Sequence, residues 1–160
     1  MRAGKSTITL ANVTKRFGDF EAVSDVTLAI EPGQVVGFVG PNGAGKTTTI
    51  SMLMGFLAPS KGTVTVLGTK IEPQTSHNVH GSIGYVAGDM VLPGALTGKQ
   101  FLAFSSAMNG RDDTRFYTLL EKLQPVLHKP LRQLSRGNKQ KIALIAALQH
   151  APSVLILDEP

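Results

Sequence analysis

A stretch of eight residues, 40–47, constrains the fold of this chain more than any other feature. It matches the spacing G-x-x-x-x-G-K-[ST] in full. An apolar segment, 35–39, precedes it, and a helical pattern follows it. Glycines at such a turn let backbone N–H groups converge on phosphate oxygens, and the helix N-terminus adds its dipole. The stretch predicts a nucleotide-phosphate site, and its residues are Gly40, Pro41, Asn42, Gly43, Ala44, Gly45, Lys46 and Thr47.

Three side chains at the end of this stretch have expected roles in holding a nucleotide. Lys46 is expected to bridge the β- and γ-phosphates, and Thr47 to ligate Mg²⁺. Thr48 is a candidate contact to the α-phosphate. The motif thus predicts a magnesium–nucleotide complex as the ligand.

A second motif lies at 154–159, where an apolar segment ends in two acids. Asp158 is expected to hold Mg²⁺ through water, opposite Thr47. Glu159 stands just beyond the strand and can polarise a water aimed at the γ-phosphate. Many strands end in Asp, but together with Lys46 the pattern indicates phosphoanhydride hydrolysis.

The order of apolar segments predicts an α/β fold. Strands alternate with helices, which favours a mainly parallel sheet, and the early strands form an antiparallel wing. Expected strands are 6–13, 22–30, 35–39, 63–67, 83–87 and 154–157. Expected helices are 43–57 (a glycine loop and then a helix), 97–108, 112–125 and 135–150.

Composition excludes several classes of protein. The 160 residues are 42% hydrophobic and 17% charged, which is typical of a globular chain. The absence of cysteine excludes a disulfide scaffold, a thiol catalyst and a thiolate zinc site. The net charge of +5 is compatible with an anionic partner. The most apolar stretch, 142–157, is interrupted and too short to span a membrane, so we expect a cytosolic chain.

A third motif, Leu-Ser-Arg-Gly-Asn at 134–138, opens the helix before the second motif. With the phosphate loop and the Leu-Ile-Leu-Asp-Glu-Pro ending at 155–160, it resembles the nucleotide-binding domain of ABC transporters. The resemblance implies a P-loop NTPase (RecA-like) fold that binds ATP and Mg²⁺ and hydrolyses ATP. It also implies a division into a β wing and P-loop core (about 1–90), a helical subdomain (about 91–135) and a signature helix with its strand (135–160).

The resemblance further implies a site shared between two chains. Ser135 and Gly137 would contact the γ-phosphate bound to a partner, so a working site needs a homodimer or a paired ATPase. Phe17 matches the aromatic residue that stacks on adenine in this family. The alternative for Phe17 is a packing role, because an aromatic face suits either.

Two departures from the family pattern concern the site. Arg136 and Asn138 replace a Gly and the Gln of the usual signature. Gly88 stands where a Gln is expected, and glycine cannot reach Mg²⁺ or water. Asp89, the adjacent oxygen ligand, is the hypothetical replacement at the metal; its alternative is a solvated loop acid.

The family's domain continues beyond Glu159 with a further strand and a switch histidine, whereas this sequence stops at Pro160. None of its four histidines stands after the second motif. We therefore expect a domain that is incomplete at its C-terminus. By itself this chain is expected to bind nucleotide and to turn it over poorly.

The functional prediction is ATP hydrolysis that powers transport through a membrane permease docked near 89–97. The signature and the stretch 92–98 look most like bacterial multidrug or antibiotic exporters, which places the chain on the inner face of the cell membrane and favours export. A GTPase switch would need Asn-Lys-x-Asp, yet Gln140 and Lys141 follow Asn138-Lys139. A small-molecule kinase does not explain the signature. A nucleic-acid ABC ATPase is allowed by charge, but no coiled-coil insertion is visible and no nucleic-acid partner is expected.

Overall fold

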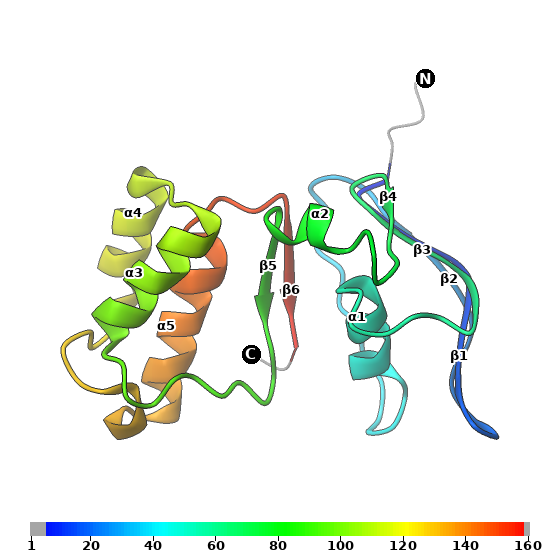
Figure 1. The fold of residues 1–160 in the computed structure, drawn as a ribbon, viewed down its shortest axis with the longest axis horizontal. Coiled ribbons are helices and arrows are strands. Elements are labelled where there is room, and N and C mark those ends of the chain that lie inside the picture. The colour runs from blue at the N-terminus through cyan, green and yellow to red at the C-terminus, as the bar shows by residue number, and fades with distance from the viewer. Residues whose placement is uncertain (1–5, 159–160) are drawn as a thin grey trace. The chain divides into compact units, whose positions relative to one another are not determined.

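The computed structural model describes residues 6–158, which form two compact units (Figure 1). The first unit reaches His80 and the second begins at Gly81. The α/β class is confirmed, with an antiparallel sheet in the first unit and a parallel pair in the second. The three-part division of the sequence stays a prediction.

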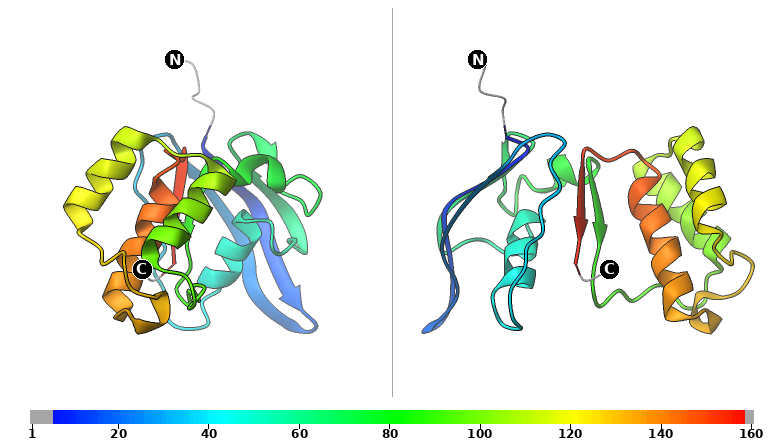
Figure 2. Two further views of the ribbon diagram at one scale, coloured as in Figure 1. Left: turned by 60° about the vertical axis from the view of Figure 1, so that its left-hand side comes forward. Right: turned by 180° about the vertical axis from the view of Figure 1, so that it is seen from behind.

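The first unit contains a four-stranded antiparallel sheet in the order β2-β1-β3-β4, seen from two further sides in Figure 2. β1 and β2 form a hairpin in which Ile8 pairs with Ile30 and Phe17 with Phe20. Alternate side chains such as Leu10 are buried, as period-two patterning requires. The strands are β1 (Ile8–Phe17), β2 (Phe20–Ile30), β3 (Lys61–Val66) and β4 (Thr69–Lys70).

Helix α1 (Lys46–Leu53) follows the glycine loop and is shorter than the expected helix to residue 57. It ends at a glycine: Gly55 takes φ +72°, and the N–H groups of Gly55 and Phe56 donate to the Met52 and Ser51 carbonyls, which closes the last turn. Met52 is fully buried on this helix. A short helix, α2 (His77–His80), closes the unit.

The expected strand at 35–39 is wrong: in the described part of the chain, this segment pairs with no strand. The side chains of Val35 and Val39 are 100% and 94% exposed. An apolar β-branched run becomes a strand only where a neighbouring backbone completes its hydrogen bonds. Composition alone cannot supply that neighbour.

The second unit carries a two-stranded parallel sheet with helices packed on it. Ile83 pairs with Val154 and Val86 with Leu157, so both strands end at the same edge. Its elements are β5 (Ile83–Val86), α3 (Gly98–Asn109), α4 (Asp113–Leu123), η1 (Leu131–Gln133), α5 (Arg136–Leu148) and β6 (Val154–Leu157).

The long helices of this unit begin within one residue of the expected starts at 97, 112 and 135, each after a capping side chain. The Thr97 hydroxyl accepts from the Gln100 N–H, and the Gln100 side chain accepts from the Thr97 N–H, which is a capping box. Asp112 caps α4, and Ser135 caps α5. Caps satisfy backbone donors that a helix leaves open, so they fix where each helix begins.

The core of this unit lies between its three helices. Its buried aliphatic side chains come from α3, η1, α5 and the turn between η1 and α5: Leu102, Leu131, Leu134, Ile142 and Ile145. Apolar side chains of α4 pack against them. Residues 136, 137 and 141 of α5 are exposed, whereas no residue of 142–148 is. Within residues 6–158, no helix has the length and apolar character needed to cross a bilayer.

Candidate nucleotide site

The glycine loop at 40–47 is held against β2 by a close backbone approach. Gly43 and Gly45 have φ of +84° and +80°, in the left-handed region. A Cβ on Gly45 would lie 2.3 Å from the Ala22 carbonyl oxygen and 2.9 Å from Val23 Cγ2. Both the dihedral and the contact therefore demand glycine at 45, and they fix the start of α1 against the hairpin.

Lys46 folds back over this loop. Its Nζ donates to the Gly40 carbonyl at 2.8 Å and to the Pro41 carbonyl at 3.1 Å. The N–H of Ala44 also donates to the Pro41 carbonyl, at 3.1 Å. The ammonium is thus held beside the loop, where phosphate oxygens would offer it stronger, charge-assisted partners.

The three threonines that follow Lys46 differ in their surroundings. Thr47 is exposed, which suits an oxygen that must reach a metal or nucleotide. Thr48 is half-buried. Thr49 is buried, and its hydroxyl donates to the Gly45 carbonyl at 2.9 Å, so it secures the first turn of α1. Sequence reasoning missed Thr49, because threonine hydroxyls look alike until burial separates them.

Phe17 ends β1 in the hairpin that Gly45 approaches. Its side chain is 49% exposed, and the Lys15 Nζ lies 5.1 Å from the ring centroid. The Phe17 ring is therefore not buried in the core, and about half of its surface is open to solvent. Its stacking on adenine stays a prediction.

The second unit brings Asp158 and the loop after β5 to one sheet edge. Asp158 follows β6, is 8% exposed, and its N–H donates to the Val86 carbonyl at 2.9 Å. Asp89 is exposed in the loop that follows Val86. Both acids thus stand at the carboxyl ends of parallel strands, where open α/β sheets bind their ligands. Glu159 lies outside the described residues.

Tyr85, which sequence reasoning also missed, interacts electrostatically with Asp158 at this edge of the sheet. Burial raises the pKa of the Tyr85 phenol, and the negative charge of Asp158 raises it further. The only sequence signal for Tyr85 was its place in an apolar strand, which says nothing of charge.

The signature segment lies at the start of α5. The Ser135 hydroxyl accepts from the Asn138 N–H at 3.3 Å, and both Ser135 and Gly137 are exposed. The Asn138 carboxamide oxygen accepts from the Val126 N–H at 3.0 Å. Asn138, a departure from the family pattern, therefore ties the segment before α5 to the signature helix.

Gly137 has no structural need to be glycine within this chain. Its φ lies outside the left-handed region, and a Cβ there would meet nothing within 4 Å. Glycine costs a helix up to about 1 kcal/mol relative to alanine.

The oxygens predicted to bind magnesium are considered unit by unit. Among the described residues, no group of three or more His, Asp or Glu side chains could hold a metal ion. Mg²⁺ in nucleotide sites is held by one or two protein oxygens together with phosphates and water. Thr47 and Asp158 each offer one such oxygen, in separate units.

A left-handed glycine, a lysine folded over its loop and a helix N-terminus define a P-loop nucleotide-binding protein. The family model for ABC transporters matches residues 23–160, and the chain belongs to this family. The resemblance seen in the motifs is thereby confirmed.

Curated relatives agree with this assignment. The chain is 36% identical over 163 residues to the "Probable multidrug ABC transporter ATP-binding protein YbhF" of Escherichia coli K12, covering 98% of this chain and 28% of the relative. It is 35% identical to "ABC transporter ATP-binding protein NatA" of Bacillus subtilis 168, covering 96% of this chain and 66% of the relative. The chain thus spans about a quarter to two thirds of these two proteins.

Solved structures share the fold. One, titled as the ATP-binding subunit of an ABC transporter, matches with a TM-score of 0.84 at 23% sequence identity. The match covers 95% of this chain and 65% of the chain in that structure. Another is the ATP-binding cassette MJ0796, described as a dimer bound to ADP and Pi. It matches with a TM-score of 0.81 at 24% sequence identity, and the match covers 94% of this chain and 72% of the cassette's chain.

Proposed function

We propose that this chain is the ATP-binding part of an ATPase that drives transport through a partner permease. The observation that carries the proposal is the loop at Gly45 and Lys46, whose glycine is enforced and whose ammonium is held beside it. Family membership favours adenine nucleotide transport ATPases over a GTPase switch or a nucleic-acid enzyme.

Each residue of the site has a physical task in this proposal. Backbone N–H groups of the loop and the Lys46 ammonium bind the phosphates, and Phe17 stacks on the base. Mg²⁺, held by Thr47 and Asp158, with Asp89 as a further candidate ligand, supplies charge neutralisation at the phosphate oxygens when bound. Glu159 orients and polarises the attacking water. Positioning and electrostatics supply most of the rate gain in such reactions.

The site is completed by a second chain in this proposal. Ser135 and Gly137 are exposed at the start of α5, and the open space around Gly137 lets another molecule approach closely. The helix N-terminus there favours an anion. The MJ0796 cassette is described as a dimer, which supports a homodimer or paired ATPase here.

The transported substrate class and direction rest on the relatives. YbhF carries a multidrug name, which supports export. A permease contacting the loop around 89–97 would hold the chain on the inner face of the cell membrane. The three-part organisation, with a helical subdomain at about 91–135, is proposed on the same basis.

Thermal unfolding with and without Mg-ATP tests the phosphate site. At about 100 times its Kd, a ligand raises the free energy of unfolding by about 2.7 kcal/mol. For a domain of this size, that corresponds to a rise in Tm of about 2–4 °C per kcal/mol. Lys46→Ala is expected to lose this rise, whereas Lys122→Ala, on the exposed face of α4, keeps it. A rise of equal size in Lys46→Ala would refute the proposed site.

A further inference from the structure

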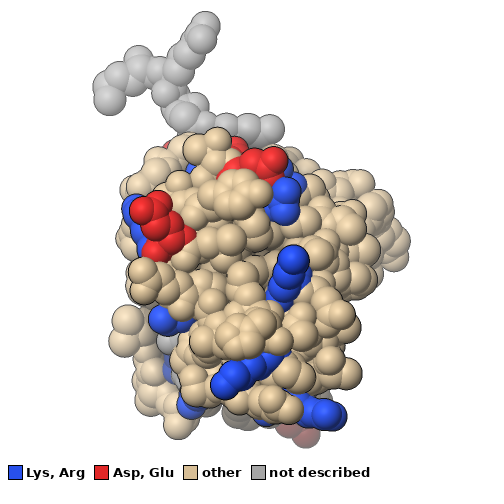
Figure 3. Space-filling view, turned by 90° about the vertical axis from the view of Figure 1, so that its left-hand side faces the viewer, with Lys and Arg blue, Asp and Glu red and all other residues tan. Residues whose placement is uncertain are grey.

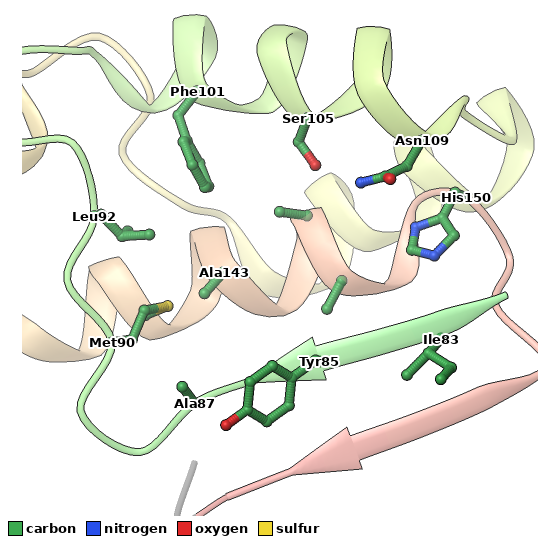
Figure 4. Close-up of a pocket in the computed structure, with 12 residues that line it drawn as sticks. Ile83, Tyr85, Ala87, Met90, Leu92, Phe101, Ser105, Asn109, Ala143 and His150 are labelled. Carbon is green, nitrogen blue, oxygen red and sulfur yellow. The ribbon is translucent and has the colours of Figure 1, made fainter. Parts of the chain in front are cut away.

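Aromatic side chains have two kinds of surroundings in this chain. In the second unit, Tyr85 and Phe101 line a pocket whose described residues include no Asp, Glu, Lys or Arg (Figure 4). In the first unit, the half-exposed ring of Phe17 has a cation over it, because the Nζ of Lys15 lies 5.1 Å from the ring centroid. An ammonium within about 6 Å of the centroid is attracted by the negative face of an aromatic ring. Lys15 therefore acts on the ring that is proposed to stack on adenine.

The ammonium of Lys15 is also fixed by the backbone. Its Nζ donates to the Ala58 carbonyl at 2.8 Å, in the segment 58–60 that follows α1. Within residues 6–158, Lys15 forms no ion pair with an acid. The carbonyl and the ring, rather than a carboxylate, therefore set where this positive charge lies.

The segment 58–60 holds the end of β1 in two further places. The Ser60 N–H donates to the Thr14 carbonyl at 2.8 Å, and the Arg16 N–H donates to the Ser60 hydroxyl at 3.0 Å. Together with the bond from Lys15, these contacts join the strand that ends at Phe17 to the segment that follows α1. Because α1 begins at the phosphate loop, the same contacts tie the ring to the helix on which the phosphates are proposed to bind.

We propose that Lys15 is a positioning residue for the nucleobase: its ammonium holds one face of the Phe17 ring and leaves the opposite face for adenine. The inference rests on the proposed function, because it takes Phe17 as the ring on which the base stacks. A side chain that is already held in place loses less conformational freedom when a ligand binds to it. Lys15 thus strengthens binding of the base, whereas Lys46 acts on the phosphates.

Isothermal titration calorimetry of the whole chain with Mg-ATP and with Mg-tripolyphosphate, which has no base, tests this role. Lys15→Met keeps an unbranched apolar stem and removes the ammonium. We expect its affinity for ATP to fall about two- to fivefold, the range of an exposed cation–π contact, and its affinity for tripolyphosphate to stay unchanged. Unchanged tripolyphosphate binding also shows that the variant is folded. Equal losses for both ligands, or no loss for ATP, would overturn the proposal.

Three further variants separate the ring from the charge. Lys15→Arg keeps a cation that can lie over the ring and donate to a carbonyl, so we expect it to bind ATP as the parent chain does. When Phe17→Leu has removed the ring, adding Lys15→Met is expected to have no further effect on ATP binding. Lys61→Met, at an exposed lysine of β3, is the matched control and leaves both affinities unchanged. A further loss of ATP affinity from Lys15→Met in the Phe17→Leu chain would remove the assigned contact.

A failure of this inference is distinguishable from a failure of the proposed function. If Lys46→Ala leaves the binding of both ligands unchanged, the phosphate site is refuted, and the role of Lys15 with it. If Phe17→Leu binds ATP as tightly as the parent chain, the base does not stack on Phe17, and the role of Lys15 fails while the phosphate site remains.

Discussion

At the residue scale, two glycines of the predicted site differ in what the fold requires of them. Gly45 is required by the chain itself, because its φ is +80° and the Ala22 carbonyl leaves no room for a Cβ. Gly137 stands in open space with an ordinary helical backbone. A motif match cannot distinguish these cases, whereas the structure shows which glycine serves the fold.

Gly137→Ala separates folding from assembly. We expect the free energy of unfolding to stay constant or to rise by up to about 1 kcal/mol, since alanine is the better helix former. We expect Mg-ATP-dependent association of chains, measured by analytical ultracentrifugation, to fall, because the methyl group blocks the approach of a partner's phosphates. Gly81→Ala, also in open space, is the control that leaves association intact. Undiminished association in Gly137→Ala would argue against a site shared between chains.

Tyr85 makes the stability of the fold depend on alkaline pH. Burial, followed by the charge of Asp158, raises the pKa of the Tyr85 phenol above its ordinary value of 10.0. The unfolded chain therefore loses this proton first, so the free energy of unfolding falls as the pH rises above about 10. Urea unfolding from about pH 8 to pH 11 is expected to show a smaller fall in Tyr85→Phe. Tyr117→Phe is the control: it keeps Tyr85, so its free energy of unfolding is expected to fall as in the parent chain. The same dependence of the free energy of unfolding on pH in the parent chain and both variants would contradict an origin in Tyr85.

At the element scale, helix boundaries were easier to predict than strands. Thr97, Asp112 and Ser135 mark helix starts in the sequence and cap those helices in the structure, because capping is a local side-chain-to-backbone bond. The segment 35–39 failed as a strand, because pairing depends on a distant backbone. The expected helix to residue 57 overlooked Gly55, whose positive φ just after the C-cap residue Met54 is a local signal for the end of α1.

The capping box of α3 has a measurable effect on stability. Thr97→Ala removes the acceptor for the Gln100 N–H, and we expect the free energy of unfolding to fall by about 1 kcal/mol. Thr118→Ala is the matched control: its hydroxyl donates to the Thr114 carbonyl inside α4, a bond that adds little to a helix. Urea denaturation compares the two, and equal losses would mean that the cap does not set this helix start.

At the scale of the whole molecule, the motifs predicted the fold class and the family, while the surroundings of the site residues came from the structure. Lys46, Asp158 and Ser135 were visible because phosphate chemistry restricts residue types at fixed spacings. The structural roles of Thr49, Tyr85 and Asn138 were not visible, since they depend on burial or on contacts with other elements. A single sequence does not show which segments pack against one another, so these roles could not be predicted from it.

The charge on one face of the molecule bears on the nucleic-acid alternative, which a binding measurement can test. The chain carries +5, yet Figure 3 shows Lys and Arg spread over the face formed by the helices, with acidic side chains beside some of them. Duplex binding draws on several phosphate contacts at once. Fluorescence anisotropy with a labelled duplex at about 150 mM salt is expected to give only nonspecific binding, with a Kd of about 10⁻⁴ M or weaker. Tight binding with a steep salt dependence would instead favour a nucleic-acid ATPase.

The position of Lys46 has a consequence for the thermodynamics of nucleotide binding. Its ammonium is already fixed by the Gly40 and Pro41 carbonyls, so the side chain is ordered before any ligand arrives. Ordering a long side chain on binding costs about 0.5–1.5 kcal/mol, and here folding has met that cost. Under the proposed function the loop would thus be preorganised: a nucleotide would replace one fixed set of hydrogen bonds with a stronger one, and little conformational entropy would be lost at Lys46.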